Sequence, residues 1–124
     1  MGINYIARKS EVFIKYWLPV IIYAIIIFCV SAVPGKDIPA VFAGQDIFAH
    51  MFEYALLAFL ISRALKQGKA GSIYIRRIGL VFVLSFLYAL SDEFHQIFVP
   101  GRVASGWDLF VDGIGIILGN LSYR

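Results

Sequence analysis

The chain has 124 residues, of which 60% are apolar and only 15% are charged. This balance is far from that of a soluble globular domain and predicts a single all-α integral membrane domain surrounded by the lipid bilayer. The net charge of +3 does not indicate a nucleic-acid partner, because the basic residues do not form a stripe with exposed aromatic side chains between them. One cysteine, Cys29, excludes an intrachain disulfide.

Four apolar segments are predicted to cross the membrane as helices, and they cover residues 16–33, 46–64, 78–99 and 107–123. Each is close to the ~20 residues that a helix needs to cross about 30 Å of hydrocarbon, and the fourth is at the short end. Turn-forming residues mark the connections, at Pro34, Gly35, Gly68, Gly71, Pro100 and Gly101. Short connections favour an antiparallel bundle of four transmembrane helices.

The first segment could instead be a signal peptide, since it follows basic residues and ends in the small-residue stretch Val30-Ser31-Ala32. Its apolar run is longer than the about 7 to 15 residues of a usual signal-peptide core, so we favour a membrane span. The residues before it are expected to form a short amphipathic or loosely ordered cytoplasmic leader.

The distribution of lysine and arginine predicts the orientation of the bundle. Nine of these residues flank one side of the four segments, and two flank the other. The nine are Arg8, Lys9, Lys15, Arg63, Lys66, Lys69, Arg76, Arg77 and Arg124, and the two are Lys36 and Arg102. Because positively charged loops stay in the cytoplasm, both termini are predicted to be cytoplasmic.

Six of the eight acidic residues and both histidines fall inside or at the ends of the predicted spans. They are Asp46, His50, Glu53, Asp92, Glu93, His95, Asp108 and Asp112. An aspartate at the centre of a membrane helix costs about 2.5 to 3.5 kcal/mol, whereas each large apolar residue contributes only about 0.3 to 0.6 kcal/mol. Such residues are rare in membrane helices and usually mark a functional site.

Helical periodicity places the polar residues on one face of each of three segments. The face of the second segment holds Asp46, His50 and Glu53. That of the third holds Ser85, Tyr88, Asp92, His95 and Gln96, while Glu93 is expected to point away from its middle. The fourth carries Ser105, Asp108 and Asp112 on the same face as Gly115 and Gly119, which allow another helix to approach closely.

The depth of these residues predicts a site that opens to the extracytoplasmic face. A rise of about 1.5 Å per residue puts them in the outer third of the bilayer, on the side opposite the basic loops. Arg102, in the turn between the third and fourth segments, is expected to lie over this site as its counter-charge. The predicted ligand-binding residues are Asp46, His50, Glu53, Tyr88, Asp92, Glu93, His95, Gln96, Arg102, Asp108 and Asp112.

Sequence motifs in the second, third and fourth segments resemble those of a known family. The run SDEFHQIFVPGR at residues 91–102, the run DIFAHMFEYALL at residues 46–57 and the pair Asp108 and Asp112 occur in the order found in the VanZ-like family. The resemblance implies a small multi-pass protein of the bacterial plasma membrane, with low-level resistance to the glycopeptide teicoplanin as the associated phenotype. It supplies no reaction mechanism.

Four interpretations of the polar residues follow. The first is a binding or remodelling site for a lipid-linked envelope precursor or a lipoglycopeptide, with Arg102 meeting an anionic group. Any catalytic residues would be among Asp92, His95, Asp108 and Asp112. The second is a divalent-metal enzyme with His50, Glu53, Asp92 and His95 as ligands, because these form i, i+3 pairs of histidine and carboxylate.

The third interpretation is a proton or cation relay, which is commonly built from carboxylates and histidines. The fourth is a hydrogen-bonded network that only specifies helix packing. Close-packing glycines would also permit a homodimer, although no face requires one.

Overall fold

The computed structural model describes residues 2–68 and 74–123, and these residues form helices joined by loops, with no strand among them. The helices are α1 (Gly2–Val12), α2 (Leu18–Ser31), α3 (Gln45–Gly68), α4 (Tyr74–Gln96) and α5 (Gly106–Ser122). A π-helical turn, η1 (Phe13–Trp17), joins α1 to α2, and a 3-10 turn, η2 (Gly35–Asp37), lies between α2 and α3. The all-helical prediction is therefore confirmed.

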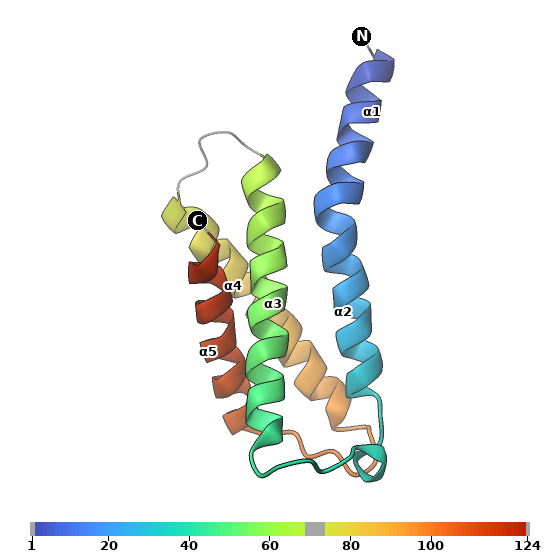
Figure 1. Cartoon of the computed structure of the whole chain (residues 1–124), viewed down its shortest axis with the longest axis vertical. Helices are drawn as coiled ribbons and strands as arrows, with labels where there is room; N and C mark the ends of the chain where they lie inside the picture. The colour runs from blue at the N-terminus through green and yellow to red at the C-terminus, as the bar shows by residue number, and fades with distance from the viewer. Residues whose placement is uncertain (1, 69–73, 124) are drawn as a thin grey trace.

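Among the described residues, three helical stretches are long and apolar enough to cross a membrane: Gly2–Ser31, Gln45–Lys66 and Tyr74–Gln96. The first is longer than predicted, because α1 and η1 continue α2 without a break and extend beyond the other helices (Figure 1). No residue of α1 is buried. The fourth predicted span corresponds to α5, which has 17 residues.

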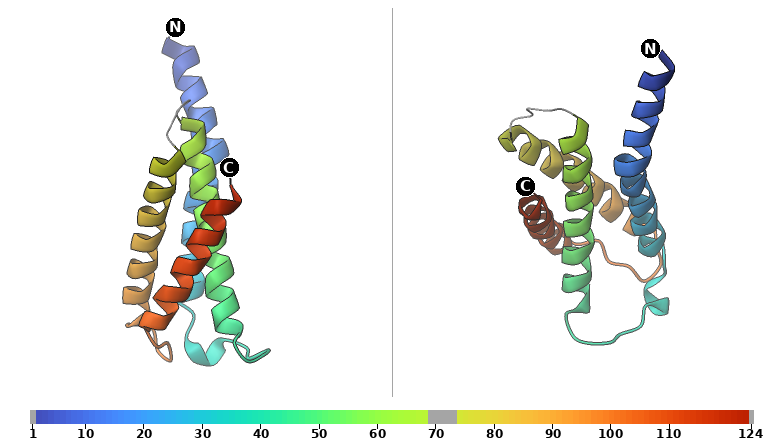
Figure 2. Two further views of the ribbon diagram at one scale, coloured as in Figure 1. Left: turned by 90° about the vertical axis from the view of Figure 1, so that its left-hand side faces the viewer. Right: turned by 45° about the horizontal axis from the view of Figure 1, so that its top comes forward.

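Helix α3 occupies the centre of the arrangement, with α2 on one side and α5 on the other (Figures 1 and 2). Its buried face consists of Tyr54, Leu57, Ala58, Ile61 and Ala64. Val81 and Ala89 of α4, Ile116 of α5 and Ile27 of α2 complete the core. Large apolar side chains such as Ile25, Leu87 and Phe110 lie on the outside, as expected for helices that contact lipid.

Helix α5 packs directly on the backbone of α3 through its two glycines. A Cβ atom at Gly115 would collide with the backbone of Met51, and one at Gly119 with the backbone of Ala55. The predicted role of these glycines in close helix packing is confirmed. A second contact between the helices lies deeper, where the Ser62 hydroxyl donates a hydrogen bond of 3.0 Å to Asn120 Oδ1.

The two proline-glycine turns meet at one end of the bundle, shown at the bottom of Figure 1. The Gly35 N–H donates a hydrogen bond of 3.0 Å to the Pro100 carbonyl oxygen. A side chain on Gly35 would collide with the backbone of Gly101, whose φ of +76° is itself a conformation that favours glycine. The loops after α2 and α4 are thereby held together at the same end of the bundle as the polar ends of α3, α4 and α5.

Candidate functional site

Seven of the eleven predicted site residues line two adjoining cavities of about 350 and 440 Å³ at this end of the bundle. We call them together the polar cavity. Both parts are lined by Ile38, Gln45, Asp46, His50, Gln96 and Arg102. Glu53 and Asp92 line the first part, and Ser105 and Asp108 line the second. Since α3 begins here and carries Arg63 and Lys66 near its other end, the polar cavity lies away from the basic end of α3.

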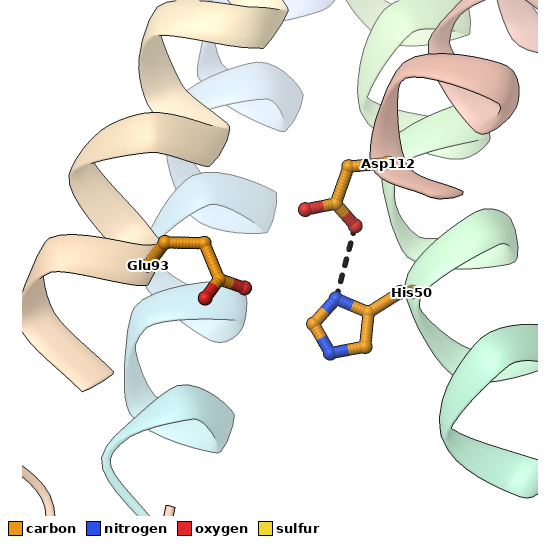
Figure 3. A group of neighbouring side chains, drawn as sticks. All are labelled: His50, Glu93 and Asp112. Atoms are coloured by element: carbon orange, nitrogen blue, oxygen red, sulfur yellow. Dashed lines mark hydrogen bonds and ion pairs between the residues drawn. The ribbon is translucent and has the colours of Figure 1, made fainter. Parts of the chain in front are cut away.

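His50, Glu93 and Asp112 form the closest group of ionisable side chains beside the polar cavity (Figure 3). His50 Nδ1 lies 2.9 Å from Asp112 Oδ1, within hydrogen-bond and ion-pair distance. A donor atom of Glu93 lies within 4.8 Å of both. Asp112 is only 1% exposed and Glu93 5%, so two carboxyl groups and an imidazole share a small buried volume.

Glu93 is one of the predicted binding residues and was expected to point away from the middle of the polar face of its helix; the structure places it on a neighbouring side of α4 from Asp92. Its carboxylate turns toward His50 and Asp112 (Figure 3). Oε2 also accepts a hydrogen bond of 3.1 Å from the Ser105 backbone N–H. The physical reason is that α4 is covered on more than one side. Asp92 faces α3 while the next residue, Glu93, faces the start of α5, so both are buried.

Asp92 is hydrogen-bonded by Tyr54, a residue outside the predicted site. The Tyr54 hydroxyl donates a hydrogen bond of 3.1 Å to Asp92 Oδ2, and both side chains are buried. Tyr54 follows Glu53 directly and lies one turn after His50, so its position on the polar part of α3 was the available signal. Glu53 lines the cavity with its side chain, and its backbone carbonyl accepts a hydrogen bond of 3.0 Å from the Tyr23 hydroxyl.

Three predicted site residues of α4 instead connect this helix to α2. The His95 ring stacks on Phe28 with a distance of 4.3 Å between ring centroids. Gln96 Nε2 donates a hydrogen bond of 3.0 Å to the Ser31 hydroxyl. The Tyr88 hydroxyl donates a hydrogen bond to the Ala24 carbonyl oxygen. Of these residues, only Gln96 also lines the polar cavity.

This placement changes the predicted set of metal ligands. Sequence spacing suggested His50, Glu53, Asp92 and His95. Among the described residues, the donors that converge are His50, Glu93 and Asp112. Spacing along one helix shows which residues share a face, but the approach of α5 determines which face meets His50.

Arg102 lines both parts of the polar cavity, but its hydrogen bonds differ from those expected of a counter-charge. Nε donates to the Val33 carbonyl and Nη2 to the Val30 carbonyl, each at 3.0 Å. Val30 lies in the last turn of α2 and its carbonyl also accepts from the Val33 N–H at 3.2 Å, whereas Val33 lies just after the helix. Arg102 therefore caps α2 and holds its guanidinium at the cavity wall.

The two remaining acids lie at the edge of the polar cavity. Asp46, in the first turn of α3, is exposed, and Asp108, in the first turn of α5, is half-buried. Both line the polar cavity, and each lies four residues before His50 or Asp112 on its helix.

Several polar atoms around the polar cavity are buried without a hydrogen-bond partner among the residues that the structure describes. They are Asp92 Oδ1, Glu93 Oε1, His95 Nδ1 and Asp112 Oδ2. Buried polar groups are usually paired, so a concentration of unpaired ones at one place requires an explanation.

Comparison with protein families matches residues 47–124 to VanZ/LLP1. The matched region begins in α3 and contains His50, Glu93 and Asp112. Neither the curated proteins nor the solved structures gave a match. Because the match covers more than half of the sequence, this chain belongs to the VanZ/LLP1 family.

Proposed function

We propose that this chain acts at the extracytoplasmic face of the bacterial plasma membrane, where its polar cavity binds a lipid headgroup or lipid-linked envelope precursor and reduces susceptibility to teicoplanin. The observation that supports this proposal is the position of the polar cavity, at the opposite end of α3 from Arg63 and Lys66. Teicoplanin acts on cell-wall precursors outside the membrane, so a site that changes its action must be reachable from that side.

The proposal includes four membrane crossings with both termini in the cytoplasm. The excess of lysine and arginine on one side of the chain supports this orientation. Helix α5 has 17 residues and a length of about 25 Å, which is short for a span. Its start at Gly106 would lie in the outer interface, where Trp107 is exposed and where water can enter the polar cavity.

The chemistry of the polar cavity suits a headgroup with both charged and hydroxyl groups. Arg102 is fixed at the wall by its two carbonyl partners and can offer its remaining N–H groups to a phosphate oxygen. The carboxylates of Asp46, Glu53 and Asp108 can accept hydrogen bonds from sugar hydroxyl or amino groups. The apolar residues on the outside allow acyl chains to remain in the bilayer.

Teicoplanin susceptibility of a sensitive Gram-positive host tests this proposal. The host would express the wild-type chain, Asp92→Asn, Arg102→Ala or the control Arg8→Ala, with membrane levels matched by immunoblotting. Arg8 lies on exposed α1, so its replacement removes one positive charge far from the polar cavity. We expect resistance with the wild type and the control, and its loss with the other two variants.

Two results would contradict the proposal. The first is a wild-type chain that does not change teicoplanin susceptibility at the same membrane level. The second is resistance that persists in both Asp92→Asn and Arg102→Ala.

A further inference from the structure

His50, Glu93 and Asp112 come from three different helices and point toward one another beside the polar cavity (Figure 3). One donor atom of each residue lies within 4.8 Å of the other two. The group forms only when α3, α4 and α5 are packed together, so it is a property of the folded chain.

The surroundings of this group contain more negative than positive side chains. Asp46, Glu53, Asp92 and Asp108 line the polar cavity, whereas Arg102 is the one lysine or arginine among the described lining residues. The hydrogen bonds of Arg102 are made to backbone carbonyls. Grouped carboxylates in a poorly solvated site need a counter-charge, and a cation would supply it.

Each of the two carboxylates has one oxygen with a hydrogen-bond partner and one without a partner among the described residues. Glu93 Oε2 accepts from the Ser105 N–H, and Asp112 Oδ1 is paired with His50 Nδ1. Glu93 Oε1 and Asp112 Oδ2 are buried and have no partner among the described residues. The Ser105 N–H contact is of the kind that orients a carboxylate for metal binding from outside the ligand set, and both carboxylates have an oxygen available as a ligand.

We propose that His50, Glu93 and Asp112 bind a divalent transition metal, with Zn²⁺ as the best-fitting ion. One imidazole nitrogen and two carboxylate oxygens suit Zn²⁺ or Mn²⁺ better than Ca²⁺ or Mg²⁺, which prefer oxygen ligands throughout. Three protein ligands leave a fourth tetrahedral position, as in catalytic zinc sites, and one of the three, His50, lines the polar cavity.

Binding requires only small movements and the loss of a proton. Zinc lies about 2.0 to 2.2 Å from nitrogen and oxygen ligands, so the three donors must draw somewhat closer than their present spacing. The ion replaces the hydrogen bond between His50 Nδ1 and Asp112 Oδ1, because His50 must donate a lone pair in place of a proton. This inference does not depend on the proposed role in teicoplanin susceptibility.

Zinc binding to the purified full-length chain in detergent tests the proposal. The affinity tag is removed, bound metal is stripped with EDTA, and Zn²⁺ is titrated by isothermal calorimetry. We expect saturation at one ion per chain. X-ray absorption of the zinc-loaded wild type is expected to show nitrogen and oxygen neighbours at about 2.0 to 2.2 Å with the outer-shell pattern of a single imidazole.

Matched variants locate the site. Glu93→Gln and Asp112→Asn remove a proposed ligand, whereas Glu53→Gln and Asp46→Asn make the same chemical changes at other residues of the polar cavity. Loss of a contact in the outer shell of a metal site already weakens binding about 10- to 100-fold, so loss of a ligand is expected to cost more than about 100-fold. Both control variants are expected to stay within about tenfold of the wild type.

Three results would overturn the proposal. One is an absence of saturable Zn²⁺ binding by the wild type. Another is equal weakening by Glu53→Gln and Glu93→Gln, which would indicate diffuse attraction to the acidic cavity. The third is sulfur scattering around the bound zinc, which would place the ion at Cys29, whose side chain is exposed. The absorption measurement uses only the wild type, so a sulfur shell or a missing imidazole overturns the proposal even where a variant fails to fold.

Discussion

Replacing Gly119 with alanine tests how closely α5 must approach α3. A methyl carbon added at Gly119 would lie 2.6 Å from the carbonyl carbon of Ala55 and 2.8 Å from its Cα. Non-bonded carbon atoms are most stable about 3.5 to 4.0 Å apart, so α5 must move away from α3 by about 1 Å. The same replacement at Gly113, on the same helix, meets no atom within 4 Å and is the matched control.

The magnitude of the effect follows from two opposing contributions. Alanine favours the helix by about 0.8 to 1.0 kcal/mol relative to glycine, and both variants gain this contribution. Overpacking of a close contact costs about 1 to 3 kcal/mol, and only Gly119→Ala bears that cost. We therefore expect the free energy of unfolding of Gly119→Ala to lie about 1 to 3 kcal/mol below that of Gly113→Ala.

The assay is SDS-driven unfolding in mild detergent micelles, followed by circular dichroism. A shift of about 1 Å would also take the pair formed by His50 and Asp112, now 2.9 Å apart, beyond hydrogen-bond distance. Gly119→Ala is therefore expected to weaken Zn²⁺ binding by at least about tenfold, while Gly113→Ala retains it. Equal stability of the two alanine variants would refute the argument, because it would mean that α5 is not seated on the Ala55 backbone.

Three further predictions follow from the same contacts. Tyr54→Phe leaves the buried carboxylate of Asp92 without its donor, so SDS unfolding should show a loss of about 1 to 3 kcal/mol, and an unchanged midpoint would contradict the contact. Arg102→Ala releases the carbonyls of Val30 and Val33, so the end of α2 should open more often, and hydrogen exchange of the neighbouring amides should be faster than in the wild type; unchanged exchange would argue against the cap. Zinc at about 100 times its Kd should raise the free energy of unfolding of the wild type by about 2.7 kcal/mol, and acidification should reduce this gain because the ligands must be deprotonated. A gain that does not depend on pH would be inconsistent with imidazole and carboxylate ligands.

Local sequence signals were sufficient for the helices and for the location of the polar residues. Apolar runs and helical periodicity are properties of single segments, and they correctly predicted the helical cores of α2, α3 and α4. The close contact between α3 and α5 was predictable in the same way, because two glycines spaced four residues apart, Gly115 and Gly119, can be recognised in the sequence of one segment.

The partners of each side chain could not be predicted in this way. Arg102 was expected to meet carboxylates, but its hydrogen bonds go to the carbonyls of Val30 and Val33 at the end of α2, and only the folded loops bring these groups together. His95 lies on the predicted face of α4 and stacks on Phe28 because α2 covers that part of the face. Both outcomes depend on how α2 packs against α4 and the loop that follows it. The periodicity of a single helix carries no information about such contacts.

The glycine contact between α5 and α3 also affects the position of Asp112, which lies on the same face of α5. Gly115 lies on Met51, the residue after His50, and Asp112 lies three residues before Gly115 on the same helix. The backbone contact at Gly115 therefore sets the distance between His50 and Asp112, one turn nearer the polar cavity. A larger side chain at Gly115 would therefore move His50 and Asp112 apart without replacing either of them. The packing of α5 on α3 and the geometry of the proposed metal site depend on the same contact.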